Sequence, residues 1–280
     1  MRLKKVLRTV LGLGRAVVVT SGELSDPAGD SARPRLVVRV RLKAGRRGRC
    51  GRCSTVAPWF DRGDGERRWR HVDVGYATCE LVADAPRVSC PDHGVVVAEV
   101  PWARHDSAFS RAMEDLVVHD AIMANKQAAA DRYGISWRAV NNACVRVATE
   151  ALGRVDLLDG LVAVAIDEVK YKKGQRYLTV VCDHFTGRVV WAVKGRSKDS
   201  VGAFFAALGE ERSARLRFVS CDGAEWIRSV VAGAAPDAIV CLDTFHVIGW
   251  ATDALDEVRR EEWNTLRQAG AAGAAKQFKG

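Results

Sequence analysis

The 280-residue sequence predicts a mixed α/β chain in three consecutive parts, and three observations support this prediction. Two short pairs of metal-binding residues lie in the first third of the chain, among segments that alternate as β-strands do. Helical spacing follows in residues 109–152. From residue 161 onward, apolar runs alternate with helical segments, as in α/β domains. The expected limits are 1–109 for a β-rich module, 110–152 for a helical segment and 153–280 for an α/β domain.

The β-rich module contains the pairs Cys50-Gly-Arg-Cys53 and Cys90-Pro-Asp-His93. Three thiolates and one imidazole are the ligand set of a tetrahedral zinc site, and two residues between ligands let one turn present both side chains to the ion. The 36 residues between Cys53 and Cys90 require strands to bring the pairs together. Two unrelated buried pairs, or disulfides, are the alternatives. We predict one structural Zn²⁺ and therefore a zinc-finger module.

Positive charge is concentrated in the same module. Residues 1–109 hold 20 Lys and Arg against 12 Asp and Glu, whereas residues 110–280 hold 23 against 22. Nine basic residues and no acid lie between Arg33 and Arg52. Such a stripe neutralises phosphates, although it is also typical of a charged strand edge. Because it leads into the zinc site, we expect contacts with double-stranded DNA from Arg39, Arg41, Arg46 and Arg47.

No export signal or membrane span is expected. The apolar run within residues 1–19 is interrupted by Arg15 and is too short to cross a bilayer. We therefore expect a cytoplasmic, nucleoid-associated protein without a membrane partner. The cysteines outside the zinc site should then be reduced and buried: Cys79, Cys144, Cys182, Cys221 and Cys241.

Four strands are expected in the β-rich module, over residues 15–20, 36–42, 67–74 and 95–100. A loop rich in Gly, Ser, Asp and Pro should occupy residues 21–34. Pro101-Trp102 should close the module.

Three helices are expected next, over residues 109–124, 126–133 and 137–152. The first has apolar spacing at Met113, Leu116, Val117 and Ile122, and Ser136 can cap the third. Small, turn and apolar residues occupy the positions that a helix-turn-helix requires, namely Ala129, Gly134, Ile135 and Val140. An ordinary corner between two helices would also use Gly and a capping Ser. As a recognition helix, the third would present Ser136, Arg138, Asn141 and Asn142 to the major groove.

The α/β part begins with a buried strand over residues 161–166, followed by a meander over 177–182 and 188–193. A helix (197–208), a strand (216–221), a helix (224–232), a strand (238–242) and a helix from residue 246 complete it. The order β-β-β-α-β-α-β-α predicts an RNase H-like fold.

Three aspartates, Asp167, Asp222 and Asp243, follow apolar strands of this domain. Carboxylates at neighbouring strand ends converge at one sheet edge, where they can hold Mg²⁺ for phosphodiester chemistry. The alternative is that an Asp after a strand caps the next helix, which Asp222 and Asp243 could also do.

The combination resembles the DDE transposases of bacterial insertion sequences, in particular the ISL-three-type family. The resemblance rests on RCGRC, RVSCPDHGVVVAEVPWARHDS, AAADRYGISWRAV, IDEVKYKKGQRYLTVVCD, VSCDGAEW and APDAIVCLDTFHV, in this order along nearly the whole chain. It implies that Asp167 and Asp222 are catalytic carboxylates that bind Mg²⁺ or Mn²⁺, with Asp243 and His246 beside the site. It also implies DNA cleavage and strand transfer at terminal inverted repeats and target DNA, by a homo-oligomer on paired ends.

This sequence differs from the family pattern at the third carboxylate of the DDE site. Spacing from Asp222 nominates Glu257, or Glu261 and Glu262 one turn further. In the family, however, a helical insertion precedes the catalytic Glu, and this sequence ends 37 residues after Asp243. We therefore expect a truncated catalytic domain without that Glu, inactive alone. The alternatives are a DNA-binding regulator of the element and, more distantly, an RNase H-like nuclease.

Overall fold

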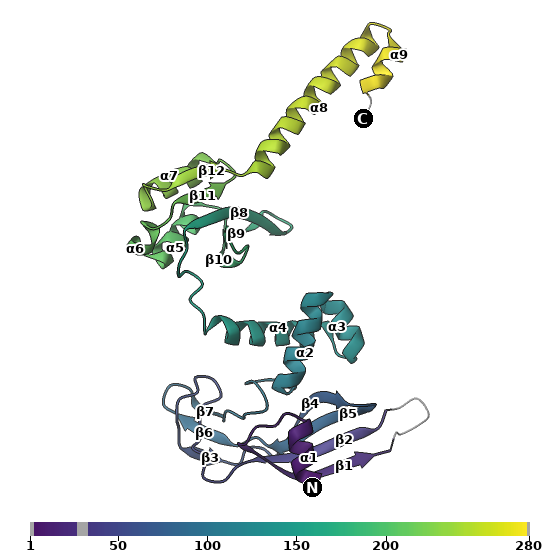
Figure 1. The fold of residues 1–280 in the computed structure, drawn as a ribbon, viewed down its shortest axis with the longest axis vertical. Coiled ribbons are helices and arrows are strands. Elements are labelled where there is room, and N and C mark those ends of the chain that lie inside the picture. Colours follow the sequence, from purple (N-terminus) through teal and green to yellow (C-terminus); the bar gives the residue numbers. More distant parts are fainter. Residues whose placement is uncertain (1–2, 27–32, 279–280) are drawn as a thin grey trace. The chain divides into compact units, whose positions relative to one another are not determined.

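A computed structural model describes residues 3–26 and 33–278, and the chain divides into two compact units, Met1–Arg154 and Val155–Gly280 (Figure 1). The mixed α/β class is confirmed, whereas the three domain limits given above stay predictions. No helix in the described ranges is both long and apolar enough to cross a membrane.

A four-stranded sheet forms the first part of unit 1, in the order β1-β2-β5-β4. Its strands are β1 (Val17–Ser25), β2 (Arg35–Leu42), β4 (Glu66–Val74) and β5 (Ala77–Asp84), and only the β2–β5 pair is parallel. Trp69 and Trp102 pack edge to face in its core, with ring centroids 5.6 Å apart. Helix α1 (Leu3–Val10), which we did not predict, packs on β1.

The expected loop over residues 21–34 is partly wrong, because β1 continues to Ser25 and pairs with β2 down to Arg35. The polar composition of residues 20–25 hides this pairing, since the ladder needs only backbone groups. Residues 27–32 of that loop lie outside the described ranges.

A small three-stranded sheet carries the zinc-finger residues, in the order β3-β6-β7. Its strands are β3 (Trp59–Asp61), β6 (Arg87–Cys90) and β7 (Gly94–Val97). Strand β7 ends three residues before the predicted limit at residue 100. Strands β3, β5 and β6 were not predicted: β3 and β6 have only three and four residues, and the eight residues of β5 lack a clear period of two.

The three predicted helices are confirmed as α2 (Arg111–Met123), α3 (Lys126–Tyr133) and α4 (Trp137–Leu152). Ser136 caps α4, and Gly134 ends α3 in the left-handed region at φ 61°. Ile122, expected on the apolar face of α2, is 76% exposed. The buried face instead runs through Met113, Glu114, Val117 and Val118.

The segment before α2 joins these helices to the four-stranded sheet. The Ser110 amide donates to the Arg70 carbonyl of β4, and the Arg70 amide donates to the Ala108 carbonyl. Buried His71 places its Nδ1 2.7 Å from the Ser110 hydroxyl, which also accepts from the Met113 amide and so caps α2. Desolvation lowers the pKa of His71 and favours the neutral ring in this position.

Unit 2 contains a five-stranded sheet in the order β10-β9-β8-β11-β12. Its strands are β8 (Ala163–Lys172), β9 (Arg176–Asp183), β10 (Val189–Lys194), β11 (Phe218–Cys221) and β12 (Ile239–Leu242). Strands β8, β9 and β10 are antiparallel, whereas β11 lies parallel to both β8 and β12. This is the predicted RNase H-like order.

Helices complete unit 2. They are α5 (Lys198–Leu208), α6 (Glu210–Ser213), α7 (Glu225–Ala234), α8 (Thr244–Gln268) and α9 (Ala272–Ala275), with a 3₁₀ turn at Lys276–Phe278. Phe204 of α5 and Val231 of α7 share one core with Val164 and Val219 of the sheet. Helix α8, in contrast, buries no residue.

Candidate metal centre, nucleic-acid interface and carboxylate row

The four predicted zinc ligands lie together in unit 1. Their ligand atoms are all within 4.8 Å of one another, and no other group of three or more such residues does this in the described ranges. The Cys50 Sγ–His93 Nδ1, Cys90 Sγ–His93 Nδ1 and Cys53 Sγ–Cys90 Sγ distances are 3.7, 3.6 and 3.7 Å. A tetrahedron with metal–sulfur bonds of about 2.3 Å has edges of about 3.8 Å. The spacing and chemistry of the donors therefore fit zinc.

Two tight backbone turns present these ligands. Cys50 pairs with Ala98 in an isolated bridge, and the Arg52 amide donates to the Cys50 sulfur at 3.4 Å. Gly51 is required between them, because a Cβ there would lie 2.6 Å from the Val97 carbonyl oxygen. The second turn is the β6–β7 hairpin, in which Cys90 pairs with Gly94. Backbone turns thus set the spacing of the two ligands within each pair.

Hydrogen bonds favour the thiolate form of Cys53, whereas desolvation raises the pKa of Cys90. The Thr55 Oγ1 lies 3.3 Å from the Cys53 Sγ, and the side-chain and backbone hydrogen bonds of Thr55 are the main causes that lower the pKa of Cys53 to about 6. By contrast, desolvation raises the pKa of the buried Cys79, in the four-stranded sheet, to about 12. Because metal binding requires the thiolate, Cys53 and Cys79 are suited to different roles.

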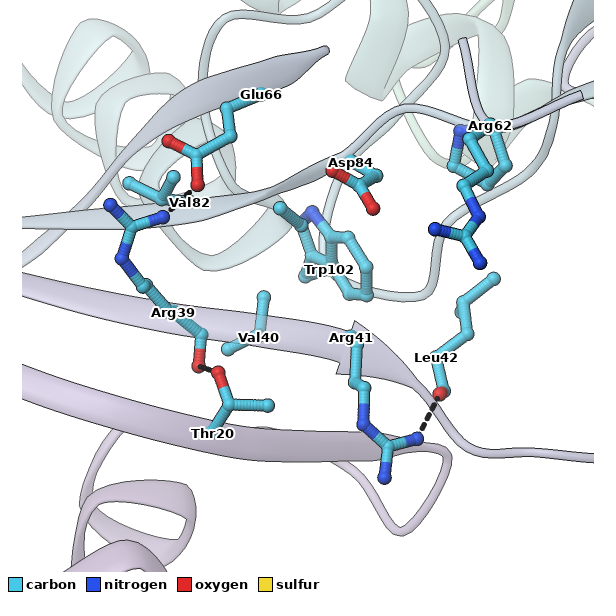
Figure 2. A pocket seen from close by; sticks show the side chains of 12 residues that line it. Thr20, Arg39, Val40, Arg41, Leu42, Arg62, Glu66, Val82, Asp84 and Trp102 are labelled. Atoms are coloured by element: carbon cyan, nitrogen blue, oxygen red, sulfur yellow. Dashed lines mark hydrogen bonds and ion pairs between the residues drawn. The ribbon is translucent and has the colours of Figure 1, made fainter.

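The arginines predicted to contact DNA differ in their availability (Figure 2). Arg39 forms an ion pair with Glu66, so its charge is compensated. Arg41 points away from that pair and donates to the Leu42 carbonyl at 3.1 Å, at the border of a depression of about 320 Å³. Arg47 is exposed, whereas Arg46 is half-buried and its carbonyl accepts from the Trp59 indole. Arg41 and Arg47 therefore keep the most accessible charge of the four.

The predicted recognition helix α4 also divides its polar residues between two roles. Arg138 and Asn142 are exposed. Ser136 is used as the cap, accepting from the Ala139 amide at 3.1 Å. Asn141 is half-buried and accepts from the Lys126 ammonium at 2.7 Å, which binds it to α3. Of the four residues predicted to face a major groove, two are thus engaged within the protein.

Two apolar residues of the exposed α4 face were missed. Trp137 is 50% exposed and Val145 is 57% exposed. Their spacing from Arg138 and Asn142 along the helix was present in the sequence, but we did not use it.

A buried ionic network lies beneath α4. Glu114 of α2 is fully buried, and its Oε1 accepts from Arg146 of α4 (Nη2, 2.6 Å) and from the Ser107 hydroxyl (2.7 Å). Its Oε2 accepts from Arg104 at 3.2 Å, and Arg104 also pairs with Glu150 of α4 at 2.6 Å. The network connects the segment before α2 with both helices. It therefore holds α4 in place relative to the rest of unit 1.

Strand register aligns the three aspartates of unit 2. Ala165 of β8 pairs with Ser220 of β11, and Ser220 pairs with Cys241 of β12. Two residues further on, Asp167 is still within β8, whereas Asp222 directly follows β11 and Asp243 directly follows β12. The three aspartates thus occupy equivalent positions along neighbouring strands, and the alternation of side chains places Asp167 on the face opposite the buried Val164. We call this set the carboxylate row.

The expectation that each aspartate ends a strand is wrong for Asp167, which lies in the middle of β8. The strand does not end at Asp167; only the burial of its residues changes there. Residues 163–166 are largely buried, and β8 then continues as an exposed hairpin with β9. The apolar run in the sequence marked the buried half only.

Each aspartate of the row has one oxygen bound to a nearby backbone amide. The Oδ1 atoms of Asp167, Asp222 and Asp243 accept from the amides of Glu168 (2.7 Å), Ala224 (3.0 Å) and Phe245 (2.9 Å). Asp243 is thereby the N-cap of α8, as the capping alternative predicted. Asp222 is not a helix cap, because the N-cap of α7 is Ala224.

Glu168 adds a fourth acidic group near the row. Its Oε2 accepts from the Arg196 Nε at 2.6 Å, while its buried Oε1 has no hydrogen-bond partner among the described residues. Burial raises the pKa of Glu168; Arg196 opposes this, and the charges of Asp222 and Asp167 raise it further. The region is therefore rich in negative charge.

The glutamates nominated by spacing do not join the row. Glu257, Glu261 and Glu262 are exposed on α8, and no group of three metal-binding side chains forms around the aspartates within residues 3–26 and 33–278. His246 is half-buried and stacks obliquely on Trp250, 6.4 Å between ring centroids. The oxygen donors suit Mg²⁺, but within the described ranges the three aspartates do not bring their ligand atoms within 4.8 Å of one another.

Comparisons with known proteins agree with this arrangement. Three family models match in order: the zinc-finger of transposase IS204/IS1001/IS1096/IS1165 over residues 46–93, the helix-turn-helix domain of transposase family ISL3 over 98–148, and the ISL3 DDE transposase over 164–280. The chain is 45% identical over 268 residues to the transposase for insertion sequence element IS1557 of Mycobacterium tuberculosis, strains CDC 1551 and H37Rv. That match covers 95% of this chain and 60% of those relatives.

A further similarity is to the transposase for insertion sequence element IS1001 of Bordetella parapertussis. The two are 30% identical over 146 residues, which is 52% of this chain and 36% of that relative.

Proposed function

Because this chain belongs to the ISL3 family of insertion-sequence transposases, we propose that it binds the ends of its own element and supplies two carboxylates for Mg²⁺-dependent cleavage and strand transfer. The observation that supports this most directly is that β8, which carries Asp167, pairs in parallel with β11, which Asp222 directly follows. In this proposal Zn²⁺ held by the Cys50–Cys53 and Cys90–His93 pairs has a structural role.

DNA recognition is assigned to α4. Arg138 can donate two hydrogen bonds to a guanine and Asn142 can pair with an adenine in the major groove. Both side chains are exposed on the same helix, and the Glu114 network fixes that helix from below. Arg41 and Arg47 would add phosphate contacts that position the protein without reading sequence.

Arg138→Ala and Asn142→Ala should each reduce the preference for terminal-repeat DNA over random DNA by about 1–3 kcal/mol, because each removes a base contact. Binding of the full chain to both duplexes should be measured by fluorescence anisotropy at several salt concentrations. Arg132→Ala, on the exposed surface of α3, is the matched control and should affect both duplexes equally. An unchanged preference in both α4 variants would argue against α4 as the reading helix.

Catalysis is assigned to the carboxylate row. Asp167 and Asp222 would hold the Mg²⁺, which neutralises charge on the reacting phosphate when bound. Asp243, whose Oδ1 caps α8, keeps Oδ2 for a role beside the site. The third carboxylate is proposed to come from a part of the longer relatives that this sequence does not include, since the glutamates of α8 are exposed. Pairing of two element ends would require at least two copies of the chain.

Asp167→Asn and Asp222→Asn should each weaken Mn²⁺ binding by roughly tenfold or more, as expected when a metal site loses a charged partner. Paramagnetic resonance titration of the full chain measures this, and Glu257→Gln serves as the control with unchanged binding. Cleavage of labelled terminal-repeat DNA with Mg²⁺ or Mn²⁺ should be negligible for the unmodified chain. Asp167-dependent cleavage, or a loss of Mn²⁺ in Glu257→Gln, would mean that α8 completes the site.

A DNA-binding regulator is the second candidate. It is favoured if the chain binds terminal-repeat DNA specifically while neither aspartate variant changes Mn²⁺ binding.

A further inference from the structure

A basic depression of about 440 Å³ lies between α1 and the start of β1, outside every site described above. Its lining includes Lys4, Lys5 and Arg8 of α1, with Arg15 and Lys43 on the strand side. The remaining lining residues are valines 17–19 of β1, and no acidic residue contributes in the described part of the chain. Five positive charges therefore surround one open surface.

Backbone geometry fixes both sides of this depression. Helix α1 ends at a left-handed Gly12, with the Gly12 amide donating to Thr9 and the Leu13 amide donating to Arg8. On the opposite side, the Lys43 amide donates to the Ala16 carbonyl at 3.0 Å, which places Lys43 beside Arg15. The cations thus come from two elements that are held in register, not from one flexible tail.

Close packing holds α1 on the sheet. A Cβ at Gly22 of β1 would lie 2.4 Å from the Leu7 Cδ1, so the Leu7 side chain packs directly over this glycine. Leu11, just after α1, is 4% exposed and belongs to the core of the four-stranded sheet. The middle of the apolar side of α1, Val6 and Leu7, is half-buried, whereas Leu3 and Val10 are exposed.

The five cations have no compensating charge. None of them forms an ion pair within residues 3–26 and 33–278, whereas Arg39 on the neighbouring strand is paired with Glu66. Like charges held together repel one another, and this repulsion is relieved when an anion binds. A surface of this kind favours a ligand with several negative charges.

We propose that this depression binds the phosphate backbone of double-stranded DNA, as a contact additional to α4 and the basic stripe; the inference rests on the DNA binding proposed above. The depression is open and its cations are spread over two elements, which suits a row of phosphates. An anionic membrane is a poorer fit, because an interfacial helix must insert a continuous apolar side, and α1 has only eight residues, of which Leu3 and Val10 are exposed while Val6 and Leu7 are half-buried. All residues that line the depression precede the matched family models, the first of which begins at residue 46.

Phosphate contacts make a distinct experimental prediction. Each neutralised phosphate contributes about 0.9 to the slope of log K against log salt concentration. Lys4→Ala/Lys5→Ala/Arg8→Ala should therefore reduce the magnitude of that slope by about 2.7, and Arg15→Gln/Lys43→Gln by about 1.8. Neither should alter the preference for terminal-repeat over random DNA, since phosphates carry no sequence information.

The test uses the full chain and both duplexes in fluorescence anisotropy titrations, with circular dichroism to verify folding. Lys194→Ala/Lys198→Ala/Arg217→Ala, three exposed cations of unit 2, changes the net charge equally and should leave the slope unchanged. An unchanged slope in both depression variants, or an equal loss in the control, overturns the inference.

Two other results are distinguishable. If the unmodified chain binds neither duplex, the proposed function itself fails. If the triple α1 variant loses binding to vesicles containing phosphatidylserine but keeps its DNA slope, a membrane is the ligand and the inference is wrong.

Discussion

Cys53→Ser should reduce the zinc content of the purified chain from about one ion to nearly none and unfold the three-stranded sheet. The other buried residues of that part are few: its core consists of Cys50, Ala57, Val88, Cys90 and Ala98, two of which are ligands. So small an apolar core cannot hold three short strands by itself. In small domains of this kind structural zinc contributes about 10–16 kcal/mol at pH 7, which becomes folding free energy.

Cys53 is the most informative of the four positions, because it is exposed and its replacement removes no core packing. Zinc per chain can be measured by atomic emission, and unfolding of residues 46–97 by limited proteolysis. Cys144→Ser, at a half-buried cysteine of α4, is the matched control and should retain its zinc. Full zinc occupancy in Cys53→Ser would contradict the assignment.

Glu114→Gln should lower the free energy of unfolding of unit 1 by about 3 kcal/mol. The substitution keeps the shape of the side chain but leaves Arg146 without its close carboxylate. Breaking a buried ion pair from one side is strongly destabilising, because the remaining charge stays desolvated. Arg104 is less affected, since it also pairs with Asp115 and Glu150.

Hydrogen exchange of the α2 and α4 amides in the full chain would measure this loss without assuming that both units unfold together. Glu211→Gln, which removes an exposed pair with Arg215 four residues away, is the control and should cost well under about 1 kcal/mol. If Glu114→Gln lowered the free energy of unfolding as little as the control does, water would have to reach the ionic network.

Local patterns in the sequence predicted the features that depend on neighbouring residues. The spacing of the Cys50–Cys53 and Cys90–His93 pairs gave the zinc ligands, because one turn sets the geometry within each pair. Ser136 and Gly134 gave the limits of α3 and α4, because capping is a property of the chain end itself. The apolar run before Asp167 gave the buried half of β8.

Features that depend on distant partners were not accessible in this way. Asn141 looked like a groove residue until the structure placed Lys126 beside it. The burial of Glu114 had no signal in the sequence, since only packing shows that Arg146 and Ser107 enclose it. Helix α1 could have been predicted, because the apolar spacing of Leu3, Leu7 and Leu11 before Gly12 was present in the sequence.

The hydrogen bonds of the carboxylate row have a consequence for the entropy of ion binding. Because a backbone amide holds one oxygen of each of Asp167, Asp222 and Asp243, the rotation of these side chains is restricted during folding. Immobilising a side chain at the moment of binding costs about 0.5–1.5 kcal/mol, with short side chains at the lower end. A cation arriving at the row would therefore meet carboxylates whose rotational freedom is already restricted, so less conformational entropy is lost when it binds.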